Sequence, residues 1–169
     1  LEALGDLVKQ GKVRQIGLSN ETPWGTMKYL ELAETKSLPR VASIQNAYNL
    51  VNRGFEIGLS EVAMHEQVGL LAYSPLAQGT LTGKYLGGQM PQGSRLALFG
   101  DGPLMMRYKG DKTQQAIEMY VNLAKKYEID PAQLAIQFCN IQPFVTSTII
   151  GATTMEQLKT CIDLSLIHI

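Results

Sequence analysis

The stretch LLAYSPLAQGTLTGKYL, residues 70–86, begins as an apolar strand and then breaks into small and polar residues. Residues 70–74 have the short apolar pattern of a buried strand. Two earlier segments, residues 13–19 and 41–48, share this pattern, so that strands are predicted to begin at residues 13, 41 and 70. This nearly even spacing leaves room for one helix between successive strands.

Apolar residues at helical spacing occupy the intervals between these strands. Pro23 stands in a first-turn position, where its missing N–H is harmless, and Asp130 followed by Pro131 is a typical N-cap and first helical residue. The sequence therefore predicts helices over residues 1–8, 22–36, 55–68, 112–127, 130–141 and 155–163, and a fourth strand over residues 147–151.

The alternation of strands and helices predicts an α/β fold with a parallel sheet, because each crossover helix has to cover the sheet that it left. The even rhythm favours a (β/α)8 TIM barrel over a doubly wound sheet. A barrel needs eight strands and about 250 residues. We therefore interpret residues 1–163 as the C-terminal half of a barrel, holding strands five to eight. Residues 164–169, LSLIHI, resemble a translated transposon end and are interpreted as a non-native tail.

Composition argues against several classes of function. The 169 residues carry no net charge and no basic stripe, so we expect no nucleic-acid partner. No apolar run approaches the roughly 18 residues of a membrane span, and no signal peptide is evident, so a cytoplasmic location is expected. Cys139 and Cys161 have no second Cys or His at metal-ligand spacing, which indicates reduced, structural thiols and no metal site.

Polar side chains stand where the strands are predicted to end. Ser19 and Asn20 close the first strand, Gln45 lies near the end of the second, and Tyr73 lies at the end of the third. In a barrel these ends face the active site. Amides and hydroxyls can bind a carboxamide, and an aromatic ring can stack on a flat heterocycle. Each residue also has a structural alternative: Ser19 and Asn20 as helix caps, Tyr73 as a core aromatic, and Gln45 as a turn-adjacent residue.

Four segments together resemble the C-terminal half of the aldo-keto reductases in order and spacing. They are GLSNETPWG, IQNAYNLVNR, LLAYSPLAQGTLTGKY and TSTIIGATTMEQLK. The likeness is to the bacterial Tas-like branch, which is related to the potassium-channel β subunits. It covers nearly the whole chain except residues 164–169.

The resemblance implies an NADP(H) site, residue by residue. Ser19, Asn20 and Gln45 would hold the nicotinamide carboxamide, and Tyr73 would stack on the nicotinamide ring. The corner after the third strand would wrap the pyrophosphate through Ser74, Pro75, Leu76, Ala77 and Gln78. The other implied contacts are Lys84 and Arg95, in the following loop, for phosphate charge, and Gly151, Thr153 and Gln157, at the start of the last helix, for the adenosine end. Taken alone, Lys84 and Arg95 could equally be surface charges.

The resemblance also implies an oxidoreductase that reduces aldehydes or ketones with NADPH, with a small carbonyl compound as substrate. The alternative is an NADPH-binding regulatory subunit of the channel β-subunit type. The family's catalytic Asp, Tyr, Lys and His are expected upstream, so no catalytic residue is assigned here and the chain alone is expected to be inactive. Its other tyrosines, Tyr108 among them, are expected to lie on helices or loops away from the strand ends.

Overall fold

Four strands form one parallel sheet in the computed structural model, which describes residues 1–100, 102 and 106–166, with side chains up to residue 163. The strands follow one another in the sheet in chain order: β1 (Ile16–Ser19), β2 (Val41–Ala47), β3 (Gly69–Tyr73) and β4 (Val145–Thr148). The predicted α/β class with a parallel sheet is therefore confirmed. The arrangement is consistent with a piece of a (β/α)8 barrel.

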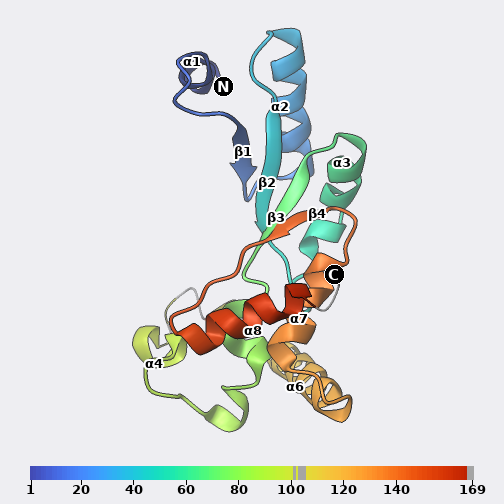
Figure 1. The fold of residues 1–169 in the computed structure, drawn as a ribbon. Coiled ribbons are helices and arrows are strands. Elements are labelled where there is room, and N and C mark those ends of the chain that lie inside the picture. Colours follow the sequence, from blue (N-terminus) through green and yellow to red (C-terminus); the bar gives the residue numbers. More distant parts are fainter. Residues whose placement is uncertain (101, 103–105, 167–169) are drawn as a thin grey trace.

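Helices connect the strands. The α-helices are α1 (Glu2–Lys9), α2 (Pro23–Thr35), α3 (Leu59–His65), α4 (Arg95–Phe99), α6 (Asp111–Lys126), α7 (Pro131–Asn140) and α8 (Met155–Leu166). The short 3-10 helices of the described residues are η1 (Gly54–Glu56), η2 (Ala77–Thr82) and η3 (Leu86–Gly88). Figure 1 shows α2 and α3 beside the sheet and α4, α6, α7 and α8 toward the carboxyl ends of the strands. The predicted N-cap of α7 is confirmed, because Oδ1 of Asp130 accepts hydrogen bonds from the N–H groups of Ala132 and Gln133.

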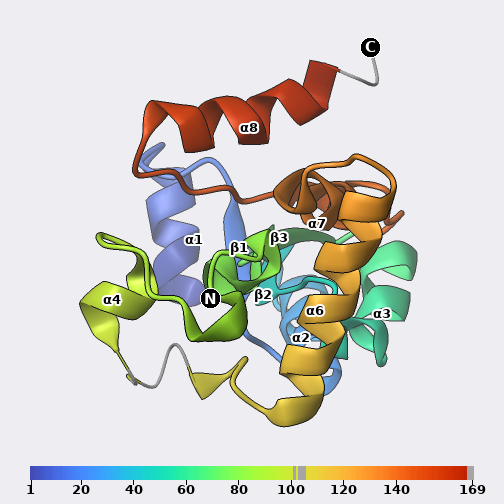
Figure 2. The same cartoon turned by 90° about the horizontal axis from the view of Figure 1, so that it is seen from below.

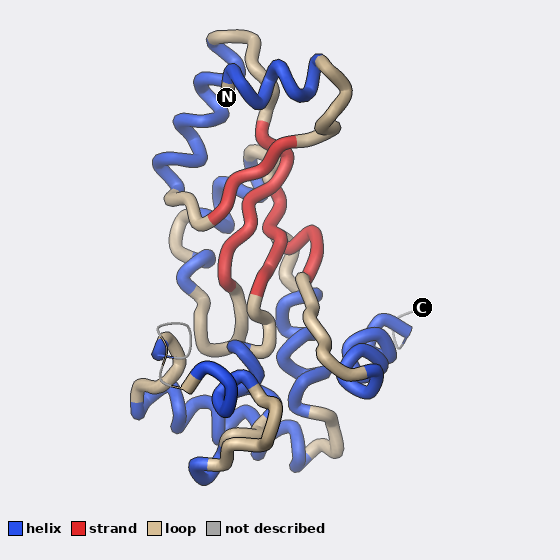
Figure 3. Tube along the Cα trace, turned by 90° about the vertical axis from the view of Figure 1, so that its left-hand side faces the viewer, coloured by secondary structure: helices blue, strands red, loops and turns tan. Residues whose placement is uncertain are grey.

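The two faces of the sheet have different surroundings. On one face Ile44, Leu70 and Ala72 are buried among the helices, where α2, α3 and α7 contact β2, β3 and β4. On the other face Gln45 stands in register between Ser19 and Leu71 and is only partly buried. Figures 1 and 3 show the block of strands without a helix over this second face. In a closed (β/α)8 barrel such a face lines the interior.

Several predicted boundaries differ from the structure. The first strand begins at Ile16 rather than residue 13, and β4 covers Val145–Thr148 rather than residues 147–151. Its register is set by Leu70, which pairs with Val145 and whose N–H donates to the carbonyl of Phe144. The helix predicted over residues 55–68 is divided, because Gly58 has a φ of 85° between η1 and α3. The predicted tail begins inside α8, and residues 167–169 lie outside the described residues.

A second apolar cluster supports the chain that leaves β3. Ala77 and Leu81 of η2 pack with Ile117 and Val121 of α6, all of them buried. Figure 2 looks along this end of the molecule and shows α6 and α7 beside the short helices. The helices η2, η3 and α4 are too short to produce a periodic apolar pattern, so the sequence does not predict them.

The side chain of Asn49 ties the end of β3 to the segment before α6. It is fully buried, and its Nδ2 donates to the carbonyl of Ser74 at 2.9 Å and to the hydroxyl of Tyr108 at 3.1 Å. Its Oδ1 accepts from the N–H of Val51 at 3.0 Å. Tyr108 therefore lies beside the end of β3, and the expectation that it lies away from the strand ends is wrong. No feature of the unpatterned segment 87–111 indicated this placement.

Leu70→Ala is expected to lower the free energy of unfolding by about 2–5 kcal/mol. Leu70 of β3 is fully buried, and the shortened side chain leaves a cavity in the core. Urea titration followed by circular dichroism measures this change. Leu98→Ala is the matched control, since Leu98 is 66% exposed in α4. Equal losses for the two variants would contradict the assignment of Leu70 to the core.

Asn49→Ala is expected to cost about 1–3 kcal/mol, because it leaves the buried hydroxyl of Tyr108 and the carbonyl of Ser74 without this donor. The same urea titration measures the loss, and hydrogen exchange should show lower protection in residues 74–83. The control is Asn122→Ala on the exposed side of α6. A stability equal to that of the control would mean that Asn49 does not anchor the corner.

Candidate functional site

Four of the predicted residues come together at the carboxyl ends of β1, β2 and β3. The N–H of Asn20 donates to the carbonyl of Gln45 at 2.9 Å. Its Nδ2 donates to Oγ of Ser19 at 3.3 Å, and its Oδ1 accepts from the hydroxyl of Tyr73 at 2.8 Å. Asn20 has a φ of 55°, a left-handed conformation that Asn tolerates better than most residues. The result is a group of amides and hydroxyls around one aromatic ring.

The structural alternatives for these residues do not match their surroundings. The N-cap of α2 is Thr22, whose Oγ1 accepts from the N–H of Gly25 at 3.0 Å, so Ser19 and Asn20 are not the caps. Gln45 lies inside β2 and not in a turn. Tyr73 is only partly buried, although its hydroxyl has a partner in Asn20, as the core-aromatic alternative expects. Ser19, Asn20 and Gln45 are therefore free of the structural roles first considered for them.

The corner after β3 has an unusual backbone. Ser74, Ala77 and Gln78 have φ values of 54°, 46° and 61°, and Gly79 follows with a φ of 95°. A left-handed conformation costs a non-glycine residue about 1–3 kcal/mol and is concentrated at ligand-binding loops. Pro75 and Ala77 are buried, whereas Leu76 packs against the cluster of Ile136 and Cys161. Strain of this kind persists only where the surrounding packing enforces it.

The side chain of Gln78 belongs to this corner and has a buried oxygen. Its Oε1 is buried and has no hydrogen-bond partner within the described part of the chain. A buried polar atom without a partner costs about 1–3 kcal/mol. A ligand with a hydrogen-bond donor would remove that cost, so the corner is suited to a polar ligand.

Lys84 and Arg95 lie on either side of η3. The side chain of Lys84 passes across Gly79, because a Cβ added there would come within 2.9 Å of Cε and 3.1 Å of Nζ. Arg95 is exposed and is the first residue of α4, not a loop residue as predicted. Its helix is joined to the corner by the N–H of Leu96, which donates to the hydroxyl of Tyr85 at 3.4 Å. Both cations thus belong to the segment that follows the corner.

Three predicted residues lie apart from this group, before and in the first turn of α8. Gly151 and Thr153 are exposed and precede the helix, which begins at Met155 as predicted. Oε1 of Gln157 accepts from the N–H of Thr153 at 3.0 Å and from its Oγ1 at 3.1 Å. The N–H of Gln157 donates to Oγ1 of Thr154 at 3.2 Å. Thr154 therefore caps α8, and the side chain of Gln157 reaches back to Thr153.

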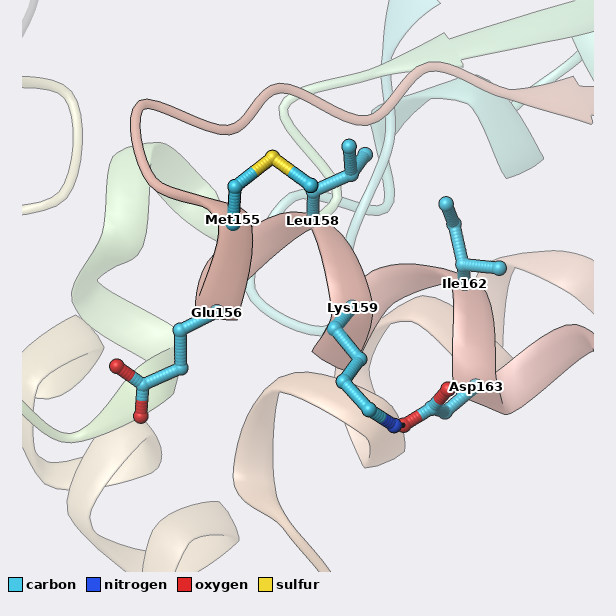
Figure 4. A pocket seen from close by; sticks show the side chains of 6 residues that line it. All are labelled: Met155, Glu156, Leu158, Lys159, Ile162 and Asp163. Carbon is cyan, nitrogen blue, oxygen red and sulfur yellow. Dashed lines mark hydrogen bonds and ion pairs between the residues drawn. The ribbon is translucent and has the colours of Figure 1, made fainter.

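A shallow pocket on α8 is a different feature. It is lined by Met155, Glu156, Leu158, Lys159, Ile162 and Asp163, and Figure 4 shows the apolar side chains along one side of the helix. Lys159 pairs with Asp163 across one turn. A single helix supplies the whole lining, and none of the predicted site residues takes part, so the pocket is not the candidate site.

Tyr108 joins the strand ends but was missed from the sequence; the buried amide of Asn49 holds its hydroxyl there. The hydroxyls of Tyr73 and Tyr108 raise the pKa of Arg107 above its ordinary value, against the opposing effect of burial. Asn49 and Tyr108 stand in segments without periodic pattern, and only the folded chain brings them together at the end of β3.

Tyr48 also lies near the strand ends but has a structural role. It is fully buried and donates a hydrogen bond to Oε1 of Glu56 at 2.7 Å. Burial, and then Glu56, raises the pKa of the Tyr48 hydroxyl. The guanidinium of Arg53 holds the pKa of Glu56 below its ordinary value. A buried phenol with a raised pKa is a poor proton donor.

Metal and thiol chemistry find no support in the described residues. Within them, no cluster of three or more His, Cys, Asp or Glu side chains could hold a metal ion. Cys139 and Cys161 are free and buried, and burial raises the pKa of Cys139 to about 12. In the same part of the chain, no helix has the length and apolar character required to cross a bilayer.

Comparison with known proteins identifies the family. The profile of the Aldo/keto reductase family matches residues 1–168. Protein tas of Escherichia coli is 53% identical over 163 residues, which are 96% of this chain and 46% of that protein. The L-glyceraldehyde 3-phosphate reductase of Escherichia coli is 34% identical over 160 residues, which are 93% of this chain and 46% of that protein.

Part of this chain also matches potassium channel β subunits. A probable voltage-gated potassium channel subunit beta of Oryza sativa is 41% identical over 91 residues, or 54% of this chain and 28% of that protein. This chain thus spans about half the length of the first two curated relatives. The match over residues 1–168 shows that the chain belongs to the aldo/keto reductase family.

Proposed function

We propose that this chain is the cofactor-binding part of an NADP(H)-dependent oxidoreductase that reduces aldehydes or ketones to alcohols. The observation that carries the proposal is the convergence of Ser19, Asn20, Gln45 and Tyr73 at the strand ends, next to the corner of residues 74–79. The unpartnered buried Oε1 of Gln78 and the left-handed backbone beside it fit a polar ligand. The residues present therefore suit a dinucleotide.

The proposed site divides the cofactor among the segments. Ser19, Asn20 and Gln45 would hold the nicotinamide carboxamide, because together they offer amide and hydroxyl groups. The ring of Tyr73 would stack on the nicotinamide, and residues 74–78 would wrap the pyrophosphate. Lys84 and Arg95 would meet the phosphates, and Gly151, Thr153 and Gln157 would contact the adenosine end. When bound, the nicotinamide supplies the hydride.

We further propose that the four strands are strands five to eight of an eight-stranded barrel. Four parallel strands with one face left partly exposed fit half of such a barrel. The chain's match to 46% of two relatives supports the same proposal. The reduction itself would then also need residues from the other strands, and a cytoplasmic location is part of the proposal.

A regulatory role is the second candidate. The partial match to a channel β subunit favours it, since that match includes about half of this chain. Such a subunit would bind NADPH at the same site, with turnover incidental. Binding measurements on the nucleotide support either candidate, whereas turnover by a completed barrel separates them.

The chain is expected to bind NADPH about ten- to a hundredfold more tightly than NADH, because charge-assisted hydrogen bonds from Arg95 or Lys84 to the 2′-phosphate are each worth about 1.5–3 kcal/mol. Isothermal titration calorimetry of the chain with both nucleotides measures the ratio. Arg95→Ala should reduce the preference, and Lys12→Ala, on an exposed residue before β1, should not. Equal affinities for the two nucleotides in the unmodified chain would refute the assignment of the 2′-phosphate.

The chain alone is expected to oxidise no NADPH in the presence of a reactive aldehyde. Reduction needs a proton donor at the developing alkoxide, and the tyrosines near the strand ends have other partners: Tyr48 donates to Glu56 and Tyr73 donates to Asn20. Absorbance at the reduced nicotinamide band measures the rate. Turnover that disappears on replacing a tyrosine of this chain would overturn the expectation.

The same assay distinguishes an enzyme from a regulatory subunit. In a chimera, this chain replaces the matching segment of the Escherichia coli L-glyceraldehyde 3-phosphate reductase. An enzyme-derived chain should support turnover of that reductase's substrate, and Tyr73→Ala in the chimera should reduce it. A folded chimera that binds NADPH without turnover would favour the regulatory role.

A further inference from the structure

Asn20 is held by two other strands at the carboxyl end of the sheet. Its N–H donates to the carbonyl of Gln45 in β2 at 2.9 Å, and its Oδ1 accepts from the hydroxyl of Tyr73 in β3 at 2.8 Å. Because β2 lies between β1 and β3, the bond to Tyr73 spans the end of β2. One strand therefore fixes the backbone of Asn20, and another fixes its side chain.

The amide of Asn20 keeps one N–H for a ligand. A side-chain amide has two N–H donors and one carbonyl oxygen. In Asn20, Nδ2 donates to Oγ of Ser19 at 3.3 Å, and its second N–H has no hydrogen-bond partner among the residues that the structure describes. Ser19 and Asn20 are both exposed, so a ligand can reach this donor. Since the hydroxyl of Tyr73 holds the oxygen end of the amide, the N–H at the other end keeps a fixed direction.

We propose that the hydroxyl of Tyr73 is a positioning group for the nicotinamide, which acts by holding the amide of Asn20 in the orientation that binds the carboxamide. The inference rests on the proposed function, because it assumes that Asn20 contacts the cofactor. An amide that is already ordered loses less conformational freedom on binding, and preorganisation of this kind increases affinity. Tyr73 thereby has two separable roles: its ring stacks on the nicotinamide, and its hydroxyl orients a neighbouring strand end.

Two ligands separate this role from a general loss of structure. NADPH contains the nicotinamide, whereas 2′,5′-ADP has the 2′-phosphate and adenosine without it. In the 169-residue chain, Tyr73→Phe keeps the ring and removes the hydroxyl. Isothermal titration calorimetry should show NADPH binding weakened about two- to tenfold, the affinity equivalent of immobilising one side chain. The affinity for 2′,5′-ADP should not change. Tyr127→Phe is the matched control and should change neither affinity, because Tyr127 is 63% exposed at the end of α6.

A double-mutant cycle tests whether the hydroxyl acts through Asn20. Asn20→Gly removes the amide, and glycine suits the left-handed backbone at this position, where φ is 55°. In that background Tyr73→Phe should have no further effect on NADPH binding.

Three results would overturn the positioning role while leaving the proposed function intact: unchanged NADPH binding by Tyr73→Phe, equal weakening of both ligands, or the same loss in the Asn20→Gly background. An unmodified chain that is folded by circular dichroism but binds neither ligand would overturn both.

Discussion

The buried amide of Asn49 is the interaction on which the carboxyl end of the sheet depends. One side chain satisfies the carbonyl of Ser74, the hydroxyl of Tyr108 and the N–H of Val51. Without it the buried hydroxyl of Tyr108 would lose a donor and the N–H of Val51 an acceptor, and buried groups without partners are rarely tolerated. The side chain of Asn49 therefore links three segments: the chain after β2 at Val51, the end of β3 at Ser74, and the segment before α6 at Tyr108.

Packing against helices explains how the strained corner persists. Ala77 has a left-handed backbone yet is fully buried, and it packs in one cluster with Leu81, Ile117 and Val121. The apolar contacts made by η2 with α6 offset the cost of the unfavourable φ values. A corner held in this way presents the same shape with or without a ligand. This is the property that a dinucleotide site requires, because a preformed site loses little freedom on binding.

The partly exposed face of the sheet fits the same interpretation. Gln45 is a polar residue on a strand, next to Ser19 in the sheet, and neither side chain belongs to the apolar core. In the described sheet, β1 and β4 each pair on one side alone. Strands with an open edge are suited to pairing with further strands. In the proposed complete barrel this pairing would enclose the polar face, where the carbonyl compound and the nicotinamide would meet.

The sequence by itself determined the α/β class, the parallel order of the strands and the residues of the motifs at their ends. These follow from local features: apolar runs of strand length, helical spacing, and proline and aspartate at helix starts. It also identified the family, since the four motifs occur in one order.

The tertiary structure alone decided which residues meet. Asn49 and Tyr108 carry no periodic signal, and the contact between them joins residues far apart in the chain. The exact ends of β4 were likewise misplaced, because pairing register depends on neighbours that a local pattern does not contain. Hydrogen bonds between distant segments form only when the packed core has fixed their backbones, and for that reason no reading of the sequence could place Tyr108 beside Asn49 at the end of β3.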